Sequence, residues 1–136
     1  MKFLLPPNWP RPSGYSNGVV ANGRTVFLSG MIGWDATGKL VSEDFVGQTR
    51  QALCNIVLLL SEAGAKPADI VRMTWYVLDK KEYTSSFKDI GVVYREIMGR
   101  HYPAMTAVQV INLVEDGARV EIEVTAVIPD VRAAAE

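Results

Sequence analysis

Two glutamates on one predicted strand are the side chains best suited to chemistry. Glu121 and Glu123 alternate along VEIEVTAV, residues 120–127, so both project from the same face of that strand. A carboxylate on a central strand is costly to bury unless it is paired or used, and in such a place it can orient a water molecule as a general base. A salt bridge to Arg119 or to another subunit is an equally good interpretation of either residue.

Ser29 is a second polar candidate, at the end of a predicted strand in the segment FLSGM. No Gly-x-Ser-x-Gly motif surrounds it, and the chain's single histidine, His101, lies far along the sequence, which disfavours a nucleophilic serine. Because Gly30 follows, we expect Ser29 to present a hydroxyl and a close-approaching backbone to a small ligand, or to satisfy a turn.

The segment GWDATGKL, residues 33–40, approaches the pattern of a phosphate-binding loop. It ends in Leu40, where the pattern requires a Ser or Thr hydroxyl for magnesium, and VSEDF does not continue directly as a helix. A turn between Asp35 and Gly38 is therefore the better interpretation.

Charge and residue counts exclude several classes of partner. The 136-residue chain has 14 Lys and Arg against 15 Asp and Glu, with no run of either sign, which disfavours binding to nucleic acid or to an anionic membrane. Cys54 is the single cysteine and His101 the single histidine, too few for a disulfide or a His/Cys metal set. We therefore expect no metal and no cofactor.

The N-terminal segment predicts a protein that stays in the cytoplasm. MKFLL is apolar, but Pro6, Pro7 and Pro10 interrupt it before the core of a signal peptide. The longest apolar run, residues 56–60, is far shorter than the roughly 20 residues of a membrane span.

Periodicity predicts a β-β-α-β-α-β-β order. Asn22-Gly23 predicts a hairpin within residues 18–30, and VEDGA predicts another between strands 104–113 and 119–128. Apolar spacing predicts helices over 44–63, with Ser42 or Asp44 as N-cap, and over 83–98. Alternation predicts a strand over 69–79, in which Trp75 and Tyr76 are interpreted as core or interface side chains.

This order gives an α+β fold with two helices on one face of a mixed sheet, which leaves the other face uncovered. On the last strand Val120, Ile122, Val124 and Ala126 would face the helices. We therefore expect a homo-oligomer that buries the uncovered face. A chain of this length fits a single domain, residues 1–136, with a Pro-rich segment over 1–14 and a tail over 130–136.

Several segments together resemble the RidA/YjgF-like (Rid) family of imine and enamine deaminases. They are GYSNGV at 14–19, VFLSG at 26–30, QTRQALCNI at 48–56, EAGAKPADIV at 62–71, YPA at 102–104 and VEIEVTAV at 120–127. The resemblance implies a chorismate-mutase-like fold and a homotrimer whose sheets form a barrel, with small-molecule clefts at the subunit interfaces.

The resemblance also implies the roles of individual residues. Glu121 would position the water that attacks the C=N carbon, and Tyr15, Ser29 and Gly30 would bind substrate. The family's deaminases of 2-imino acids have, directly after PA, an Arg that binds the substrate carboxylate, and here that residue is Met105.

Two further positions of the family pattern differ. Ala107 replaces a Cys, and Gly91 replaces an Asn. The resemblance implies that Met105 and Glu121 face one cleft, although a register slip at VEDGA would reverse this.

These observations predict a hydrolase of a small enamine or imine other than the ordinary 2-imino acids, because a thioether cannot pair with a carboxylate. Alternatively, Arg11, Arg24 or Arg100 supplies the missing charge. A non-enzymatic small-molecule binder or regulator is the second interpretation. An endoribonuclease or translation inhibitor is the least favoured, because the chain is mildly acidic.

Overall fold

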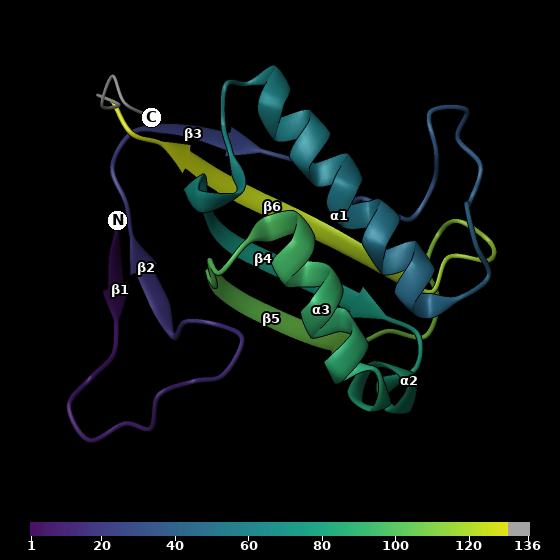
Figure 1. The fold of residues 1–136 in the computed structure, drawn as a ribbon, viewed down its shortest axis with the longest axis horizontal. Coiled ribbons are helices and arrows are strands. Elements are labelled where there is room, and N and C mark those ends of the chain that lie inside the picture. Colours follow the sequence, from purple (N-terminus) through teal and green to yellow (C-terminus); the bar gives the residue numbers. More distant parts are fainter. Residues whose placement is uncertain (131–136) are drawn as a thin grey trace.

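The computed structural model describes residues 1–130, so the predicted tail lies almost entirely outside the described residues. Its main sheet has four strands: β3 (Arg24–Phe27), β4 (Ile70–Val77), β5 (Ala104–Gln109) and β6 (Val120–Ile128). Their order is β3-β6-β4-β5, with β4 parallel to β5 and β6 antiparallel to both of its neighbours. The helices cover one face of this mixed sheet (Figure 1), which confirms the predicted α+β fold.

The first helix, α1 (Phe45–Glu62), begins where its sequence predicts. The Asp44 carboxylate accepts a hydrogen bond of 2.9 Å from the N–H of Gly47, which satisfies one of the free donors at a helix start. Leu53, Ile56 and Leu60 are fully buried against the sheet. The helix is therefore fixed by its cap at one end and by its apolar stripe along its length.

The predicted helix over 83–98 is two helices, α2 (Lys80–Ser85) and α3 (Phe87–Met98). The Asp79 carboxylate accepts from the N–H groups of Lys81 and Glu82, at 2.9 and 3.3 Å, so helical structure begins earlier than predicted. Ser86 has φ −101° and ψ 6°, which interrupts the helix and turns its axis.

The hairpin predicted around Asn22-Gly23 is wrong. The strand before it, β2 (Gly18–Val20), pairs with β1 (Lys2–Leu4) in a separate two-stranded sheet, and β3 pairs with β6. Gly23 has φ +147°, and a Cβ there would lie 1.9 Å from the carbonyl oxygen of Ile128. The glycine is needed because the chain passes directly against the end of β6.

The hairpin predicted at VEDGA is also wrong. Gly117 does turn the chain, with φ +86°, but β5 and β6 do not pair because β4 lies between them. β5 is instead the parallel partner of β4, reached through α2 and α3, since parallel strands need a crossover connection. The strand order is therefore not the one that the turn signal at VEDGA predicts.

The two faces of the sheet have different environments. Val120, Ile122, Val124 and Ala126 are buried beneath the helices, as the alternation predicts, and the residues between them are only half-buried. On the uncovered face the side chain of Phe27 is 78% exposed. This face, which we call the open face, carries the side chains of Phe27, Tyr76, Val108, Glu121 and Glu123.

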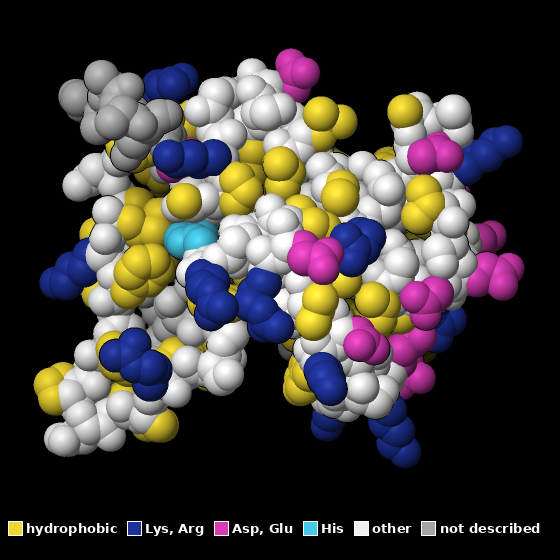
Figure 2. Space-filling view, viewed as in Figure 1, with side chains coloured by type: hydrophobic (Ala, Val, Ile, Leu, Met, Phe, Trp, Pro, Cys, Tyr) yellow, Lys and Arg dark blue, Asp and Glu magenta, His cyan; other side chains and the backbone are white. Residues whose placement is uncertain are grey.

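Figure 2 shows the opposite, helix-covered side of the molecule. Lys and Arg side chains are distributed over both ends of this side, and Asp and Glu gather towards the end that carries α2. Within residues 1–130, none of the helices combines the length and the hydropathy that a bilayer span requires.

Candidate functional site

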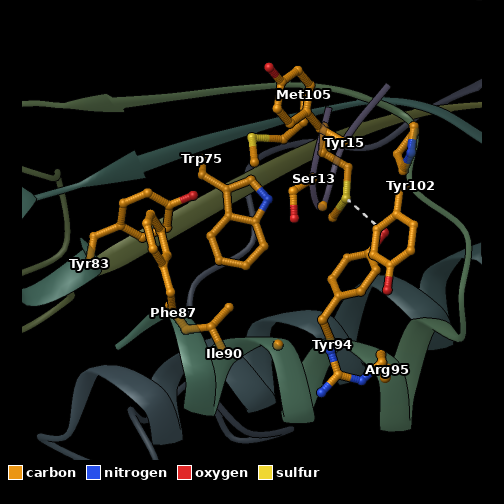
Figure 3. A pocket seen from close by; sticks show the side chains of 14 residues that line it. Ser13, Tyr15, Trp75, Tyr83, Phe87, Ile90, Tyr94, Arg95, Tyr102 and Met105 are labelled. Carbon is orange, nitrogen blue, oxygen red and sulfur yellow. Dashed lines mark hydrogen bonds between the residues drawn. The ribbon is translucent and has the colours of Figure 1, made fainter. Parts of the chain in front are cut away.

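A cavity of about 600 Å³ lies between α3 and the helix-covered face of the sheet (Figure 3). Met73 and Met105 occupy paired positions on β4 and β5, so their side chains project to the same side of the sheet. The other walls are largely aromatic: Tyr15, Trp75, Tyr83, Phe87, Tyr94 and Tyr102. The cavity therefore favours an apolar or planar ligand.

Contacts within the chain hold the α3 wall of this cavity. The Tyr94 hydroxyl donates to the carbonyl of His101 at 2.5 Å and lies 3.8 Å from the Met73 sulfur. Its ring stacks on Tyr102, with 5.5 Å between the centroids. Burial, together with the neighbouring Tyr102, raises the pKa of Tyr94 well above its usual value, so this hydroxyl remains a neutral donor.

Tyr15 reaches the cavity because the next residue is tied to the start of β5. The N–H of Ser16 donates to the carbonyl of Pro103 at 3.0 Å, and its hydroxyl donates to the carbonyl of Tyr102 at 2.5 Å. Ala107 lies on the same side of the sheet, paired with Trp75, but it does not line the cavity. Tyr15 and Met105 are thus brought together, with Ala107 nearby.

Glu121 and Gly30 are in contact on the open face. A Cβ built on Gly30 would lie 2.3 Å from Oε2 of Glu121, so the carboxylate rests directly against the glycine backbone. Reciprocal hydrogen bonds of 2.8 and 2.9 Å between the backbones of Met31 and Ile122 fix this approach. Ser29 is exposed beside Gly30. These residues form a second group, separate from the cavity.

The two glutamates of β6 differ in their partners. Glu123 accepts a hydrogen bond of 2.6 Å from the Tyr76 hydroxyl, and this bond raises the pKa of Tyr76. Within residues 1–130, Glu121 has neither a hydrogen bond nor an ion pair from its side chain. The carboxylate available to an external group or water is therefore that of Glu121.

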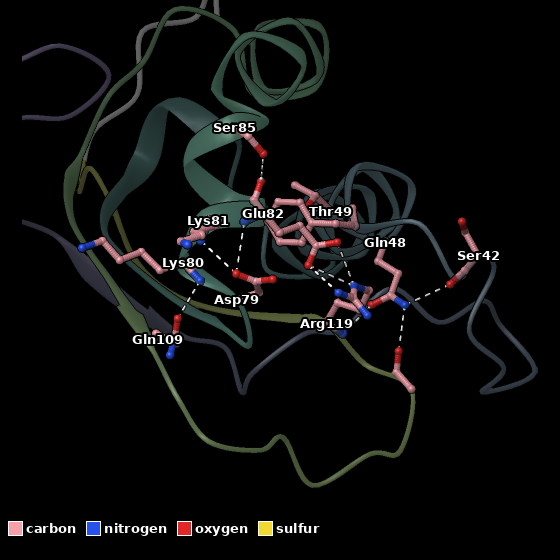
Figure 4. Close-up of polar contacts among 12 residues, drawn as sticks. Ser42, Gln48, Thr49, Asp79, Lys80, Lys81, Glu82, Ser85, Gln109 and Arg119 are labelled. Atoms are coloured by element: carbon pink, nitrogen blue, oxygen red, sulfur yellow. Dashed lines mark hydrogen bonds and ion pairs between the residues drawn. The ribbon is translucent and has the colours of Figure 1, made fainter.

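The salt bridge considered between Arg119 and these glutamates is wrong. Arg119 pairs with Glu82 of α2 through Nε and Nη2, at 2.9 and 2.7 Å (Figure 4), and this contact raises the pKa of Arg119. The buried Gln48 accepts from the N–H of Arg119 at 2.7 Å and donates to the carbonyl of Gly117 at 2.9 Å. These bonds fix the start of β6, close to Glu121.

Met105 and Glu121 lie on opposite faces of the sheet. Met105 pairs with Met73 on one side of β4, and Glu121 pairs with Tyr76 on the other. Because Met73 and Tyr76 are three positions apart on one strand, their side chains project to opposite faces. Within a single chain the two side chains therefore do not share a cleft, and the expectation that they face one cleft at a subunit interface stays a prediction.

Several cavity residues were not anticipated as site residues. The strand pattern predicts a core or interface position for Trp75, Tyr102 contributes only to the YPA segment of the resemblance, and Arg95 carries no assignment; all three line the cavity. The cavity lining does not include the cations proposed as substitutes for the missing Arg, which are Arg11, Arg24 and Arg100. The helical spacing of Gly91 and Arg95 was the available signal, since residues four apart lie on one helix face. The described part of the chain holds no cluster of three or more His, Cys, Asp or Glu able to bind a metal ion.

Comparison with known proteins agrees with this architecture. Residues 9–128 match the family described as Endoribonuclease L-PSP. A RutC family protein of Pyrococcus horikoshii is 36% identical over 92% of this chain and 96% of its own length. A 2-iminobutanoate/2-iminopropanoate deaminase of Capra hircus is 36% identical over 83% of this chain and 79% of its own length.

A solved structure supports the same relationship. A protein of the conserved Rid family from Yersinia pestis has a TM-score of 0.83 and 32% sequence identity, covering 93% of this chain and 98% of the other. The match extends over nearly the whole of both chains, so it covers the cavity and the open face together. The chain belongs to the family described as Endoribonuclease L-PSP, which includes the RutC and Rid proteins.

Proposed function

We propose that this protein hydrolyses a small enamine or imine to a carbonyl compound and ammonia. The observation that carries the proposal is the Glu121 carboxylate, which rests against Gly30 without a partner from residues 1–130. The name of the Capra hircus relative supports the reaction class. No metal or cofactor is needed in this proposal, since water and a carboxylate are sufficient for hydrolysis of a C=N bond.

In the proposed reaction, Glu121 takes a proton from a water molecule as the water oxygen attacks the carbon of a protonated imine. The tetrahedral intermediate carries a hydroxyl and an amine. Glu121 returns this proton to the nitrogen, and as the C–N bond breaks the regenerated carboxylate takes the proton of the hydroxyl, so that ammonia is released and the carbonyl product remains. An enamine first takes a proton on carbon to become the imine. Ser29 and Gly30 would hold the reacting centre, and Tyr15 the body of the substrate.

We further propose that the protein acts as a homotrimer. The separation of Met105 and Glu121 supports this, because the cavity of one chain and the Glu121 edge of its own sheet face different directions. A second copy that packs its open face against the cavity side of the first would bring Glu121 of one chain to the cavity of another. Such an arrangement would also cover the exposed Phe27.

The substrate is proposed to differ from the ordinary short 2-imino acids. Met105 stands where an Arg would pair with the carboxylate of such a substrate, and a thioether offers neither charge nor a donor. The aromatic walls of the cavity support a more apolar substrate.

The test is an assay of imine hydrolysis. An amino-acid oxidase generates 2-imino acids in the reaction, and the amount of imine that semicarbazide traps is followed, because hydrolysis reduces it. On the imines or enamines that the wild type hydrolyses, Glu121→Gln should lower the rate by about 10²- to 10⁴-fold, the usual contribution of a general base. Glu123→Gln is the matched control, because its carboxylate is engaged by Tyr76, and should retain most activity.

Met105→Arg completes this set of variants. If it hydrolyses short 2-imino acids and the wild type does not, the water site is intact and the natural substrate places its charge elsewhere. Absence of ammonia release by every variant, on both 2-imino acids and reactive enamines, would refute the proposed hydrolase.

Met105 also supports a second function, in which the protein binds a small molecule without turnover. Ligand-dependent melting shifts without ammonia release would favour this function, and rapid turnover would exclude it. We do not favour the ribonuclease activity that the family description names, because the chain carries balanced charge, with 14 basic and 15 acidic residues. RNA cleavage that depends on Glu121 in highly purified protein would reverse that judgement.

A further inference from the structure

The cavity contains a buried hydrogen-bond donor without a partner. The Trp75 side chain is 3% exposed, and within residues 1–130 its indole Nε1 has no acceptor. In Figure 3 the nitrogen edge of the ring faces the interior of the cavity, away from Tyr83 and Phe87. Because buried donors are nearly always paired, such a group indicates that a ligand or water accepts its hydrogen bond.

The rim of the same cavity carries a cation. Arg95 lies on α3 one turn after Gly91, and a Cβ at Gly91 would lie 3.2 Å from its Nη1. Glycine at that position therefore leaves room for the guanidinium to fold back along the helix. Arg50 and Arg119 form ion pairs with Glu96 and Glu82, whereas the Arg95 guanidinium has no such partner among the described residues.

The walls between these two groups suit a flat, apolar body. Tyr94 and Tyr102 stack at 5.5 Å on one side, and Tyr83 and Phe87 meet edge to face at 5.0 Å on the other. Met73 and Met105 add polarisable sulfur, which makes favourable contacts with aromatic rings. A volume of about 600 Å³ exceeds what a short aliphatic acid needs.

We propose that the cavity binds an aromatic carboxylate, with Arg95 pairing with the carboxylate at the rim and Trp75 Nε1 donating to a second acceptor inside. This inference rests on the proposed function in one respect: the substrate would be the imine or enamine of such an acid. Arg95 on α3 would then take the role of the Arg that the family pattern has on the strand, at the position where this chain has Met105. Its position at the rim selects a longer, ring-containing acid over a short one.

Calorimetric titration of the purified protein with phenylacetate, 4-hydroxyphenylacetate, phenylacetamide and acetate tests this binding mode. Phenylacetate should bind, and acetate should bind at least about tenfold more weakly because it lacks the ring. Arg95→Gln should weaken phenylacetate by about tenfold or more and leave the uncharged phenylacetamide unchanged. Trp75→Phe keeps a ring but loses the donor, so it should weaken 4-hydroxyphenylacetate, whose phenolic oxygen can accept inside the cavity, and leave phenylacetate, which has no second acceptor, nearly unchanged.

Arg100→Gln is the matched control, because it removes one positive charge from a residue that does not line the cavity. It should leave binding unchanged. Equal weakening by Arg95→Gln and Arg100→Gln, or acetate binding as tightly as phenylacetate, would overturn the inference. If Trp75→Phe fails to fold, the pair of arginine variants still decides the question.

Turnover separates this inference from the proposed function. Arg95-dependent binding of phenylacetate without hydrolysis of any imine would uphold the inference and refute the deaminase. Conversely, hydrolysis of imines made from leucine and phenylalanine at equal rates, with neither rate changed by Arg95→Gln, would overturn the inference and leave the deaminase standing. Preference for the phenylalanine imine that disappears in Arg95→Gln supports both.

Discussion

The two faces of the sheet differ in how much of their environment the chain itself supplies. The helix-covered face is complete within one chain: Tyr94, Tyr102 and Ser16 hold the cavity wall through internal hydrogen bonds and ring stacking. The open face has no such cover, and Phe27 and part of Val108 are exposed on the same face of the sheet as Glu121. A binding cavity can therefore form in a single chain, whereas the environment of the proposed water site depends on what covers the open face.

The two requirements of the proposed hydrolysis, substrate binding and water activation, lie on different faces of the sheet. Substrate binding needs an apolar cavity, which the helix-covered face provides. Activation of water needs a free carboxylate, which Glu121 provides on the other face. Because they lie on opposite faces of one chain, the proposed hydrolysis would depend on the proposed assembly, and variants at either face can test this dependence independently.

The largest effect is expected from Phe27→Asp on the open face. A charge at this 78% exposed apolar position would be buried without a partner if a second copy covers the face, at a cost of several kcal/mol. The wild type should scatter light as a trimer, and the variant as a monomer without imine hydrolysis.

Leu58→Asp is the matched control for Phe27→Asp. Leu58 is a comparably exposed apolar residue, 66% exposed on α1 on the helix-covered side. The Leu58→Asp substitution should leave the trimer intact. An unchanged molar mass for Phe27→Asp would show that the open face is not the assembly surface.

An intermediate effect is expected from Gly30→Ala, which alters the water site without removing a functional group. The added methyl would lie 2.3 Å from Glu121 Oε2, so the carboxylate must move by about an ångström, and such a displacement commonly costs about 10² in rate. Steady-state kinetics should show a fall in kcat with little change in KM.

Gly91→Ala is the contrasting variant at the cavity. Its methyl would lie 3.2 Å from the end of the flexible Arg95 side chain, so it should raise KM for an aromatic carboxylate and leave kcat nearly unchanged. The same kinetic pattern from both glycine variants would mean that cavity and water site are not separate units.

The parts of the fold that could be predicted are those with local causes. α1 begins at Asp44 because its side chain caps the helix, and β6 alternates because one face is buried. Asn22-Gly23 and Asp116-Gly117 do change the direction of the chain, but the strands flanking them pair elsewhere. Strand pairing depends on contacts distant in sequence, which a turn dipeptide does not specify.

The candidate site shows the same division. Glu121 and Gly30 lie in contact, but the roles that the family resemblance implies for them stay a prediction. The cavity position of Trp75 was not predicted, because a strand tryptophan facing the core gives the same apolar pattern as one facing a cavity. Arg95 was missed because its importance depends on Gly91 leaving space for it, which is a property of the packed helix.

The smallest effect is expected at the cavity wall, from Tyr94→Phe. The hydroxyl donates to the carbonyl of His101 at 2.5 Å, so its removal should lower the free energy of unfolding by about 1 kcal/mol at pH 7. Because this effect arises within one chain, it should appear equally in the wild-type background and in the Phe27→Asp background. Tyr15→Phe, with a half-exposed ring, is the control and should change stability little.

The pH dependence of the Tyr94 effect distinguishes a buried hydroxyl from a loosely packed one. The pKa of Tyr94 is raised above its ordinary value of 10.0, first by burial and then by Tyr102. The protonated form is therefore favoured in the folded state, and its contribution to stability is present below pH 10 and lost as the pH rises above that value. The stability advantage of the wild type over Tyr94→Phe should fall by about 1.4 kcal/mol per pH unit above pH 10, so an advantage of about 1 kcal/mol at pH 7 should be abolished or slightly reversed at pH 11. Urea unfolding at pH 7 and pH 11 measures it, and a constant difference would show that the cavity wall opens to solvent in the folded protein.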